Sequence, residues 1–401
     1  MRRAFIISFF FILLAGPAVT AKPKKIESIP FEVVGSYVII KARINNSSVL
    51  NLILDSGIRN TIITELMPGD NISLNYSDVK ELMGLGGGEH LEAYTSDYNT
   101  LKIGKLELHN KTVYVLKNDV FNLSKHTGTI INGLIGVDFF QDYILQIDYT
   151  QHRLRFYEPN TLDLPKGYGM LPMTIEAQKM FVELSVLQSD STRKQVKMMI
   201  DTGAELNAWF QTSTNQSVHV PSKWIQGVIG QGLNGIITGK YGHIPQIWFG
   251  DFCLKNPIVS FPDSTTITGI LATSKRDGTI GSQLLSRFNM YIDYRQRKFY
   301  FKPNGDFNKR YFYNVAGIEI IQITPYLSLS EVLDVWANSP ASRAGVKPGD
   351  QIIEINGTKA FEYKVSEIRM IFETPSKRPL KLTLLRGGKE ISVRIDMTDK
   401  I

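Results

Sequence analysis

The chain has 401 residues, a formal net charge of +7 and a single cysteine, Cys253. One cysteine excludes an intramolecular disulfide, so the fold depends on buried apolar surface, and this length supplies two or three domains. The basic residues are scattered among acids without a long Lys/Arg block or interleaved aromatic side chains, which argues against a nucleic acid partner.

The first 21 residues have the layout of a secretory signal peptide. Two arginines precede an apolar run from Phe5 to Ala15, and a Val-Thr-Ala end at Ala21 offers a cleavage site. An uncleaved anchor is the weaker alternative, because the run is shorter than the roughly 18 residues that span a bilayer. We therefore expect an exported protein, periplasmic or extracellular, without stable membrane insertion after cleavage.

From about residue 31 onward the sequence is typical of a mainly β protein and repeats itself in two halves. "NLILDSG" delivers Asp55 at the end of an apolar run, and "MMIDTG" delivers Asp201 in the same way, 146 residues later (201 − 55). Gly133 and Gly278 begin matching Gly-x-Ile-Gly segments, and an "IDY" hairpin closes each half. Chance recurrence of one tripeptide cannot produce this order, so we predict two equivalent units.

The paired aspartates suggest acid–base chemistry. Two carboxylates brought together by a pseudo-twofold arrangement would share one proton, so that one could deprotonate a water while the other protonates a carbonyl oxygen. The residues that follow suit this task. Glycine lets the backbone approach the carboxylates closely, and a hydroxyl can hydrogen-bond across the interface between the units. These supporting residues are Ser56, Gly57, Thr202 and Gly203.

The doubled Asp-Ser/Thr-Gly and Gly-x-Ile-Gly pattern resembles the aspartic proteases of the pepsin and retropepsin class, over about residues 30–303. The resemblance implies two β lobes with a substrate cleft between them and Asp55 and Asp201 as the catalytic dyad. The compact halves look like two retropepsin units fused in one chain, so a monomer is expected. Ile58 stands where the family usually has a small residue, which leaves open a non-catalytic peptide-binding or scaffold protein with a degenerate cleft.

Two glycine-rich segments lie where the family has flaps that cover the cleft. They are "GLGGGEH" at 84–90 and "GVIGQGLNG" at 227–235, and ordinary surface hairpins are the alternative. The flap candidates are Gly86, Gly87, Gly88, Gly230 and Gly232, with Tyr94 as the flap aromatic residue.

The C-terminal segment resembles a PDZ domain of the bacterial protease-associated kind. Ser-Pro-Ala, Ala-Gly, Pro-Gly-Asp and Ile-Asn-Gly elements occur in order within residues 331–358. PDZ domains bind extended peptides by adding a strand to a sheet edge. By position, residues 325–329 would be that edge, with Tyr326, Leu327 and Leu329 contacting the peptide. Alternatively, the domain packs on the protease lobes as a fixed module.

These patterns predict a mainly β, two-lobed acid-protease β-barrel architecture followed by a PDZ-like β-rich domain. The expected parts are a signal peptide at 1–21, lobes at 22–160 and 161–310, and the PDZ domain at 311–401. The six histidines show no zinc-ligand spacing, so neither a metal nor another cofactor is expected. The predicted function is an exported aspartic endopeptidase that cleaves peptides or unfolded proteins.

Overall fold

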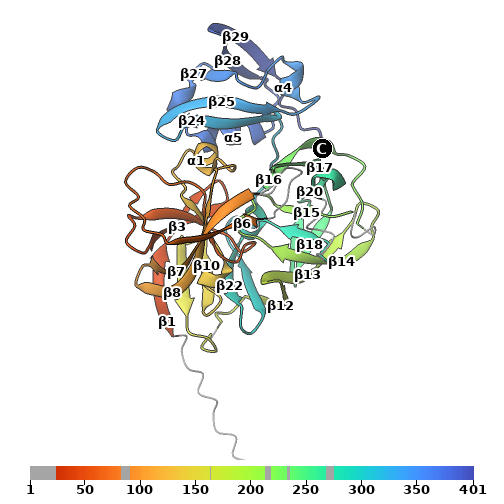
Figure 1. Cartoon of the computed structure of the whole chain (residues 1–401). Coiled ribbons are helices and arrows are strands. Elements are labelled where there is room, and N and C mark those ends of the chain that lie inside the picture. The colour runs from red at the N-terminus through yellow and green to blue at the C-terminus, as the bar shows by residue number, and fades with distance from the viewer. Residues whose placement is uncertain (1–23, 83–90, 163, 213–217, 233–234, 268–274) are drawn as a thin grey trace, which may run out of the picture.

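The computed structural model describes residues 24–82, 91–162, 164–212, 218–232, 235–267 and 275–401. Two β lobes lie side by side, and a third β-rich domain made by the C-terminal residues lies above them in the view of Figure 1. The expected mainly β architecture is confirmed. The predicted signal peptide lies outside the described residues, within which no helix is long and apolar enough to cross a membrane.

The first lobe is built on a sheet with the strand order β2-β3-β4-β9-β5-β8-β7-β6. In β3, Ile40, Ala42 and Ile44 are buried while Lys41 and Arg43 between them are exposed, the period of two that a half-buried strand requires. The elements of this lobe are β2 (Glu32–Val34), β3 (Tyr37–Ile44), β4 (Leu50–Leu54), β5 (Thr61–Ile63), β6 (Tyr76–Leu82), β7 (Leu91–Ile103), β8 (Leu106–Leu116), α1 (Leu123–Thr127), β9 (Gly133–Ile135) and the 3-10 turn η1 (Val137–Phe139).

A second, larger sheet begins with three strands of the first half and continues through the second lobe in the order β1-β11-β10-β22-β23-β12-β13-β14-β21-β15-β20-β17-β16, with β18 attached to β13 and β19 attached to β18. Its elements are β1 (Lys25–Pro30), β10 (Ile144–Asp148), β11 (Arg153–Tyr157), β12 (Gly169–Glu176), β13 (Lys179–Leu187), β14 (Arg193–Ile200), β15 (Ala208–Phe210), β16 (Ile225–Gly232), β17 (Gly235–His243), β18 (Gln246–Phe249), β19 (Phe252–Lys255), β20 (Ile258–Pro262), α2 (Ser264–Ile267), β21 (Gly278–Ile280), α3 (Ser282–Leu285), β22 (Phe288–Asp293) and β23 (Lys298–Pro303).

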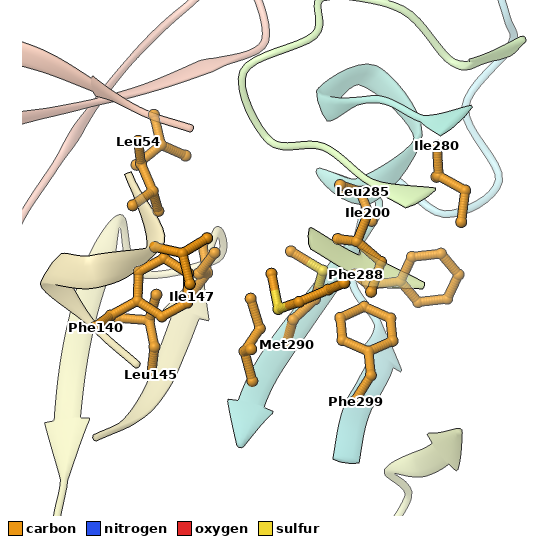
Figure 2. Close-up of a cluster of buried hydrophobic side chains, with 14 of the residues drawn as sticks. Leu54, Phe140, Leu145, Ile147, Ile200, Ile280, Leu285, Phe288, Met290 and Phe299 are labelled. Carbon is orange, nitrogen blue, oxygen red and sulfur yellow. The ribbon is translucent and has the colours of Figure 1, made fainter. Parts of the chain in front are cut away.

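The two lobes are joined where the repeated "IDY" segments meet. β10 of the first half pairs antiparallel with β22 of the second, with Leu145 opposite Ile292 and Ile147 opposite Met290. One hydrophobic core cluster therefore extends across both lobes. Figure 2 shows part of it, including Leu54, which directly precedes the first aspartate.

The structure explains why each Gly-x-Ile-Gly segment begins with glycine. β9 pairs in parallel with β4, and β21 pairs in parallel with β14, so each supports the strand that leads to an aspartate. A Cβ on Gly133 would lie 2.1 Å from the backbone oxygen of Ile62, and one on Gly278 would lie 2.1 Å from that of Trp209. Glycine is required at both positions because another strand crosses there at close range.

The C-terminal domain has a core of its own around a sheet in the order β24-β25-β26-β28-β29. Asn356 and Gly357 both have positive φ, 52° and 88°, in the turn that joins β26 to β27. The elements are β24 (Ile318–Thr324), β25 (Leu327–Val335), α4 (Pro340–Arg343), β26 (Gln351–Ile355), β27 (Thr358–Lys359), η3 (Ala360–Glu362), α5 (Val365–Glu373), β28 (Leu380–Arg386) and β29 (Lys389–Ile395).

Candidate active site

The two aspartate loops have the same backbone hydrogen bonds. The amide of Asp55 donates to the carbonyl of Ile135, and the amide of Asp201 donates to that of Ile280, both at 3.0 Å. Each carboxylate then accepts from the glycine two residues later, at 2.7 Å from Gly57 and 3.1 Å from Gly203. Backbone contacts thus orient both carboxylates.

The two carboxylates face each other across the lobe interface. A Cβ on Gly57 would lie 2.7 Å from the nearest carboxylate oxygen of Asp201, and a Cβ on Gly203 would lie 2.3 Å from Cγ of Asp55. Each carboxylate therefore lies against the loop that carries the other one. The two predicted dyad residues are 146 positions apart in the sequence (201 − 55) and lie close together in the fold.

Reciprocal hydrogen bonds connect the loops beneath the carboxylates. The amide of Ser56 donates to Oγ1 of Thr202, and the amide of Thr202 donates to Oγ of Ser56, both at 3.0 Å. Each hydroxyl also donates across the interface, Ser56 to the carbonyl of Ile200 and Thr202 to that of Leu54, at 2.9 and 2.7 Å. All four bonds are buried, so the loops are held in one relative register.

Burial and proximity make the two carboxyls unequal. Burial raises the pKa of Asp55 well above its ordinary value, and the negative charge of Asp201 raises it further. Burial also raises the pKa of Asp201, but the positive charges of Arg276 and Lys179 oppose that increase. The two carboxyls therefore titrate as a coupled pair that shares one proton.

Sequence reasoning missed the two cations beside the dyad. Lys179 and Arg276 line the same cavity as the aspartates. Arg276 is only 3% exposed, and burial lowers its pKa to about 10 against the attraction of Asp201. A comparison of the two halves could have found Arg276. It stands two residues before Gly278, whereas the equivalent position before Gly133 in the first half is the apolar Ile131.

The dyad opens into a cavity of about 1270 Å³ lined by both lobes and by the C-terminal domain. Much of its wall is apolar. Ile58, the departure from the family pattern, is one of these wall residues and leaves the hydrogen bonds of the loop intact. The other large apolar side chains of the wall include Ile62, Phe121, Trp209, Ile229 and Ile237.

The two predicted flaps differ in what the structure shows of them. Residues 83–90, with Gly86, Gly87 and Gly88, lie outside the described residues, beyond the paired strands β6 and β7. Gly230 and Gly232 lie on β16, which pairs with β17 in a hairpin, and both line the cavity.

Tyr94 does not have the predicted position of a flap aromatic residue. Its neighbours on β7, Ala93 and Thr95, are buried, so Tyr94 points to the other face, where it is 39% exposed and packs on Tyr76 at 5.2 Å between ring centroids. Tyr114 on the adjacent strand lines the cavity instead. Alternation along the strand therefore decides which of the two faces each tyrosine occupies.

The residues predicted for the peptide edge of the C-terminal domain lie in the β24–β25 hairpin. Tyr326 lies in the turn between β24 and β25, and Leu327 and Leu329 lie on β25, all three exposed. β24 is the end strand of the sheet, and β25 pairs with β24 on one side and, at Glu331 opposite Gln351, with β26 on the other. In this hairpin the first strand, β24, forms the edge of the sheet. The sequence pattern alone did not show which of the two strands would lie at the edge.

This sheet edge is covered by the first lobe. α1 packs against both β24 and α5 (Figure 1). At the end of α1, a Cβ on Gly128 would lie 2.5 Å from Oε1 of Gln322 and 2.9 Å from Cγ1 of Val365. The position at which a peptide would add to the sheet is therefore occupied by the chain itself.

A charged cluster connects all three parts of the protein around Arg369 of α5. Arg369 donates to Nδ1 of His126 at 3.0 Å and lies 3.8 Å from the carboxylate of Glu205, which also accepts from the amide of Ser36 at 2.9 Å. Burial and the nearby Arg369 charge lower the pKa of His126 to about 4. This cluster, defined by Arg369, His126, Glu205, Glu319 and Glu373, lines the same cavity as the dyad.

The C-terminal domain also rests on the β16–β17 hairpin. The indole of Trp336 stacks on Tyr241 at 5.7 Å with an interplanar angle of 8°, and a Cβ on Gly227 would lie 2.4 Å from its ring. The indole N–H donates to Glu319 at 3.0 Å. The hairpin that carries two of the predicted flap glycines is thus held at its base by the third domain.

Comparisons with known proteins agree with this architecture. An aspartyl protease family model matches residues 40–139 and 185–282, one segment in each lobe, and a PDZ domain model matches residues 331–386. The chain therefore belongs to the aspartyl protease family and combines two fused lobes with a C-terminal PDZ domain.

Two further similarities cover the chain to different extents. The chain is 29% identical over 68 residues to the putative zinc metalloprotease mll0638 of Mesorhizobium japonicum, a match that spans 17% of this chain and 18% of that protein. The crystal structure of an aspartic proteinase from Irpex lacteus superposes with a TM-score of 0.43 at 12% identity, covering 71% of this chain and 98% of that one.

Proposed function

We propose that this protein is an exported aspartic endopeptidase in which Asp55 and Asp201 activate a water molecule between them. The observation that supports this most strongly is the reciprocal contact of each carboxylate with the glycine of the opposite loop. Holding two carboxylates together in a buried site is costly, and sharing a proton for acid–base catalysis gives that arrangement a use.

In this proposal the two carboxyls take different roles. Asp201, which carries the negative charge, takes a proton from the water as its oxygen attacks the peptide carbonyl. Asp55, which carries the proton, donates it to the carbonyl oxygen, and a tetrahedral diol forms. Asp201 then passes its proton to the amide nitrogen while Asp55 recovers one from a hydroxyl. The C–N bond breaks, and an acid and an amine leave.

The substrate in this proposal is a peptide or an unfolded protein segment. The cavity has room for several side chains, and the β16–β17 hairpin lies where it can cover an extended chain. In this proposal residues 22–160 and 161–310 are the two catalytic units. Residues 311–401 are a PDZ domain whose sheet edge binds α1 and accepts an external peptide only after α1 leaves.

The test is cleavage of an unfolded protein mixture between about pH 4 and 8, a range that spans plausible dyad titrations. New termini are mapped by mass spectrometry for the chain from residue 22 and for its Asp201→Asn variant. Asp142→Asn is the matched control, because Asp142 is an exposed surface carboxylate paired with Arg295. We expect cleavage by the wild type and Asp142→Asn and none by Asp201→Asn. Equal cleavage by all three, or by none in folded samples, would reject the proposal.

A further inference from the structure

The loop that carries Asp201 is tied to the first lobe by a closed set of hydrogen bonds. The amide of Ser36, in the turn between β2 and β3, donates to Oε1 of Glu205 at 2.9 Å. The hydroxyl of Ser282 donates to the carbonyl of Ala204 at 2.9 Å, so Ser36 is the donor in the 2.6 Å contact between the two serine hydroxyls. Ser36 therefore binds this loop region twice, through its backbone and through its side chain.

The first aspartate loop is anchored by other groups. The positions that correspond to Glu205 and Ser282 hold Arg59 and Val137 there, and neither side chain can accept a hydrogen bond. The carbonyl of Arg59 accepts from the amide of Asp138 at 3.0 Å, so a backbone bond ties that loop to η1. The fold therefore permits an aspartate loop without a carboxylate at this position, and Glu205 needs an explanation of its own.

The C-terminal domain reaches the same anchor through Arg369 of α5, the helix that contacts the first lobe (Figure 1). Nη2 of the guanidinium donates to the carbonyl of Ile320 at 3.2 Å and to Nδ1 of His126 at 3.0 Å. Nη1 lies 3.8 Å from Oε2 of Glu205, whose Oε1 accepts from Ser36. The two oxygens of Glu205 thus face two different domains, and bonds to both the C-terminal domain and the first lobe fix the guanidinium.

This ion pair is shielded from solvent. Only 24% of the Glu205 side chain and 26% of the Arg369 side chain are exposed, so water screens their attraction less than it does between fully exposed groups. Burial raises the pKa of Glu205, and the charge of Arg369, followed by the bond from Ser36, opposes that increase. Without the cation, the carboxylate must either take up a proton or move towards water, and both changes weaken its bond to the first lobe.

Attachment of the C-terminal domain does not by itself require the ion pair. Trp336 stacks on Tyr241, and α1 packs against β24 and α5, so other contacts already dock the domain on both lobes. A partly buried ion pair adds little stability, because the desolvation of its charges offsets their attraction. Its distinctive property is its place, four residues after Asp201 (205 − 201).

We propose that Glu205 and Arg369 are positioning residues that hold the Asp201 loop, so that the C-terminal domain is a working part of the active site. This inference rests on the proposed function, because it gives Asp201 a task that depends on its exact position. Glu205 acts through the backbone of its own loop, and Arg369 acts through Glu205. When the pair is broken, the domain stays docked, but the carboxylate of Asp201 shifts relative to that of Asp55.

The first test measures kcat and KM in the full chain, with a fluorogenic peptide chosen from the mapped cleavage sites. Arg369→Met should lower kcat by about tenfold with little change in KM, because a displaced reacting group slows the chemical step. Glu205→Gln should lower kcat to a similar extent. The double variant should be no slower than either single variant, because both changes break one contact. Arg369→Lys, which keeps the charge, should recover most of the kcat lost in Arg369→Met.

Arg386→Met is the matched control. Arg386 belongs to the same domain, and its Nε donates at 2.6 Å to Asp350, a fully buried carboxylate of that domain. Its loss should lower the melting temperature and leave kcat unchanged. An equal loss of kcat in Arg386→Met and Arg369→Met would reduce the role of Arg369 to stability and overturn the inference, as would an unchanged kcat in Arg369→Met. If Arg369→Met does not fold, Glu205→Gln is compared with the control in its place.

A second test does not depend on turnover. Amide hydrogen exchange, followed by mass spectrometry, should become about tenfold faster in peptides that cover residues 34–38 and 201–206 of Arg369→Met, because the bond from Ser36 and the loop it holds open more often. Both peptides should keep the wild-type rate in Arg386→Met. Exchange at the wild-type rate in Arg369→Met would overturn the inference.

Failure of the inference can be told apart from failure of the proposed function. Cleavage by the wild type, with kcat unchanged in Arg369→Met, would reject the positioning role alone. If the wild type cleaves nothing, the hydrolase is rejected, and the exchange rates then decide whether Arg369 holds the loop.

Discussion

The loops that follow β4 and β14 share their backbone hydrogen bonds but carry opposite charges a few residues further on. Asp55 and Asp201 make equivalent bonds to the Gly-x-Ile-Gly strands, while four residues after them stand Arg59 in one lobe and Glu205 in the other. The bonds that position the carboxylates tolerate little change, since each fixes a backbone group at the lobe interface. The side chains that point into the cavity are free to differ.

This difference gives the cavity two unlike regions. Glu205 binds the backbone of Ser36 and lies beside Arg369 of the PDZ domain, so that region is acidic and partly covered by the third domain. The opposite loop carries Arg59, near the turn that leads to Lys179. Two nearly equivalent lobes thus produce a cavity with a positive charge on one side and a charged domain contact on the other.

The largest expected effect tests the equivalence of the two aspartates. Asp55→Asn and Asp201→Asn should each lower kcat/KM by about 10²–10⁴-fold, because either change removes one partner in proton transfer. The measurement is the rate of cleavage of a fluorogenic peptide chosen from the mapped cleavage sites. A loss confined to one of the two variants would show that the carboxylates do not act as a pair.

Substitution of the glycines that face the carboxylates should have the next largest effect on activity. Gly57→Ala and Gly203→Ala each place a methyl group within 2.7 Å of the opposite carboxylate, which must move or rotate. A displacement of that size costs activity of about 10²-fold. Gly305→Ala is the control, since a Cβ there has no neighbour within 4 Å. Activity equal to that of the control in both variants would contradict the facing arrangement.

A third variant tests the link between the PDZ domain and the second lobe. Trp336→Ala removes the stack on Tyr241 and the packing on Gly227. We expect a loss of about 2 kcal/mol in the free energy of unfolding, less than in a closed core because the neighbouring cavity admits water. Hydrogen exchange should increase in the β16–β17 hairpin. Phe361→Ala, at a side chain 60% exposed in the same domain, should change neither quantity.

The smallest expected effect concerns the acidic region and depends on pH. Burial, followed by the charges of Glu205 and Glu319, raises the pKa of Glu373 to about 7, above the value of 4.5 expected in the unfolded chain. The folded state therefore holds a proton that the unfolded state releases, so stability is kept below pH 4.5 and lost as pH rises towards 7. Arg369 opposes the shift without cancelling it.

Glu373→Gln should flatten this part of the stability curve. At pH 8 we expect the variant to be more stable than the wild type by on the order of 1–2 kcal/mol, and at pH 4 to be equal to it. Denaturant unfolding at both pH values measures the difference, with exposed Glu362→Gln as the control. His126 titrates in the opposite sense, because its lowered pKa removes stability as pH falls from 6.5 towards 4. A variant that lost stability at pH 8 would contradict the assigned direction.

The amino-acid sequence by itself determined the parts that depend on short-range rules. Alternation along the strands gave the mainly β fold, and the order of Asp-Ser/Thr-Gly before Gly-x-Ile-Gly identified the two lobes, since apolar strands and turn residues are local features. The same rules identified Ser56, Thr202 and the two aspartates as candidate site residues.

Only the tertiary structure decided how the remaining surfaces meet. It placed Arg276 and Lys179 beside the dyad, turned Tyr94 away from the cavity, and put β24 rather than β25 at the edge of the PDZ sheet, where α1 covers it. Each of these facts depends on contacts between residues far apart in the chain, whose approach is set by the packing of whole sheets and domains. A local pattern specifies which face of a strand is apolar, but not which element will lie against it.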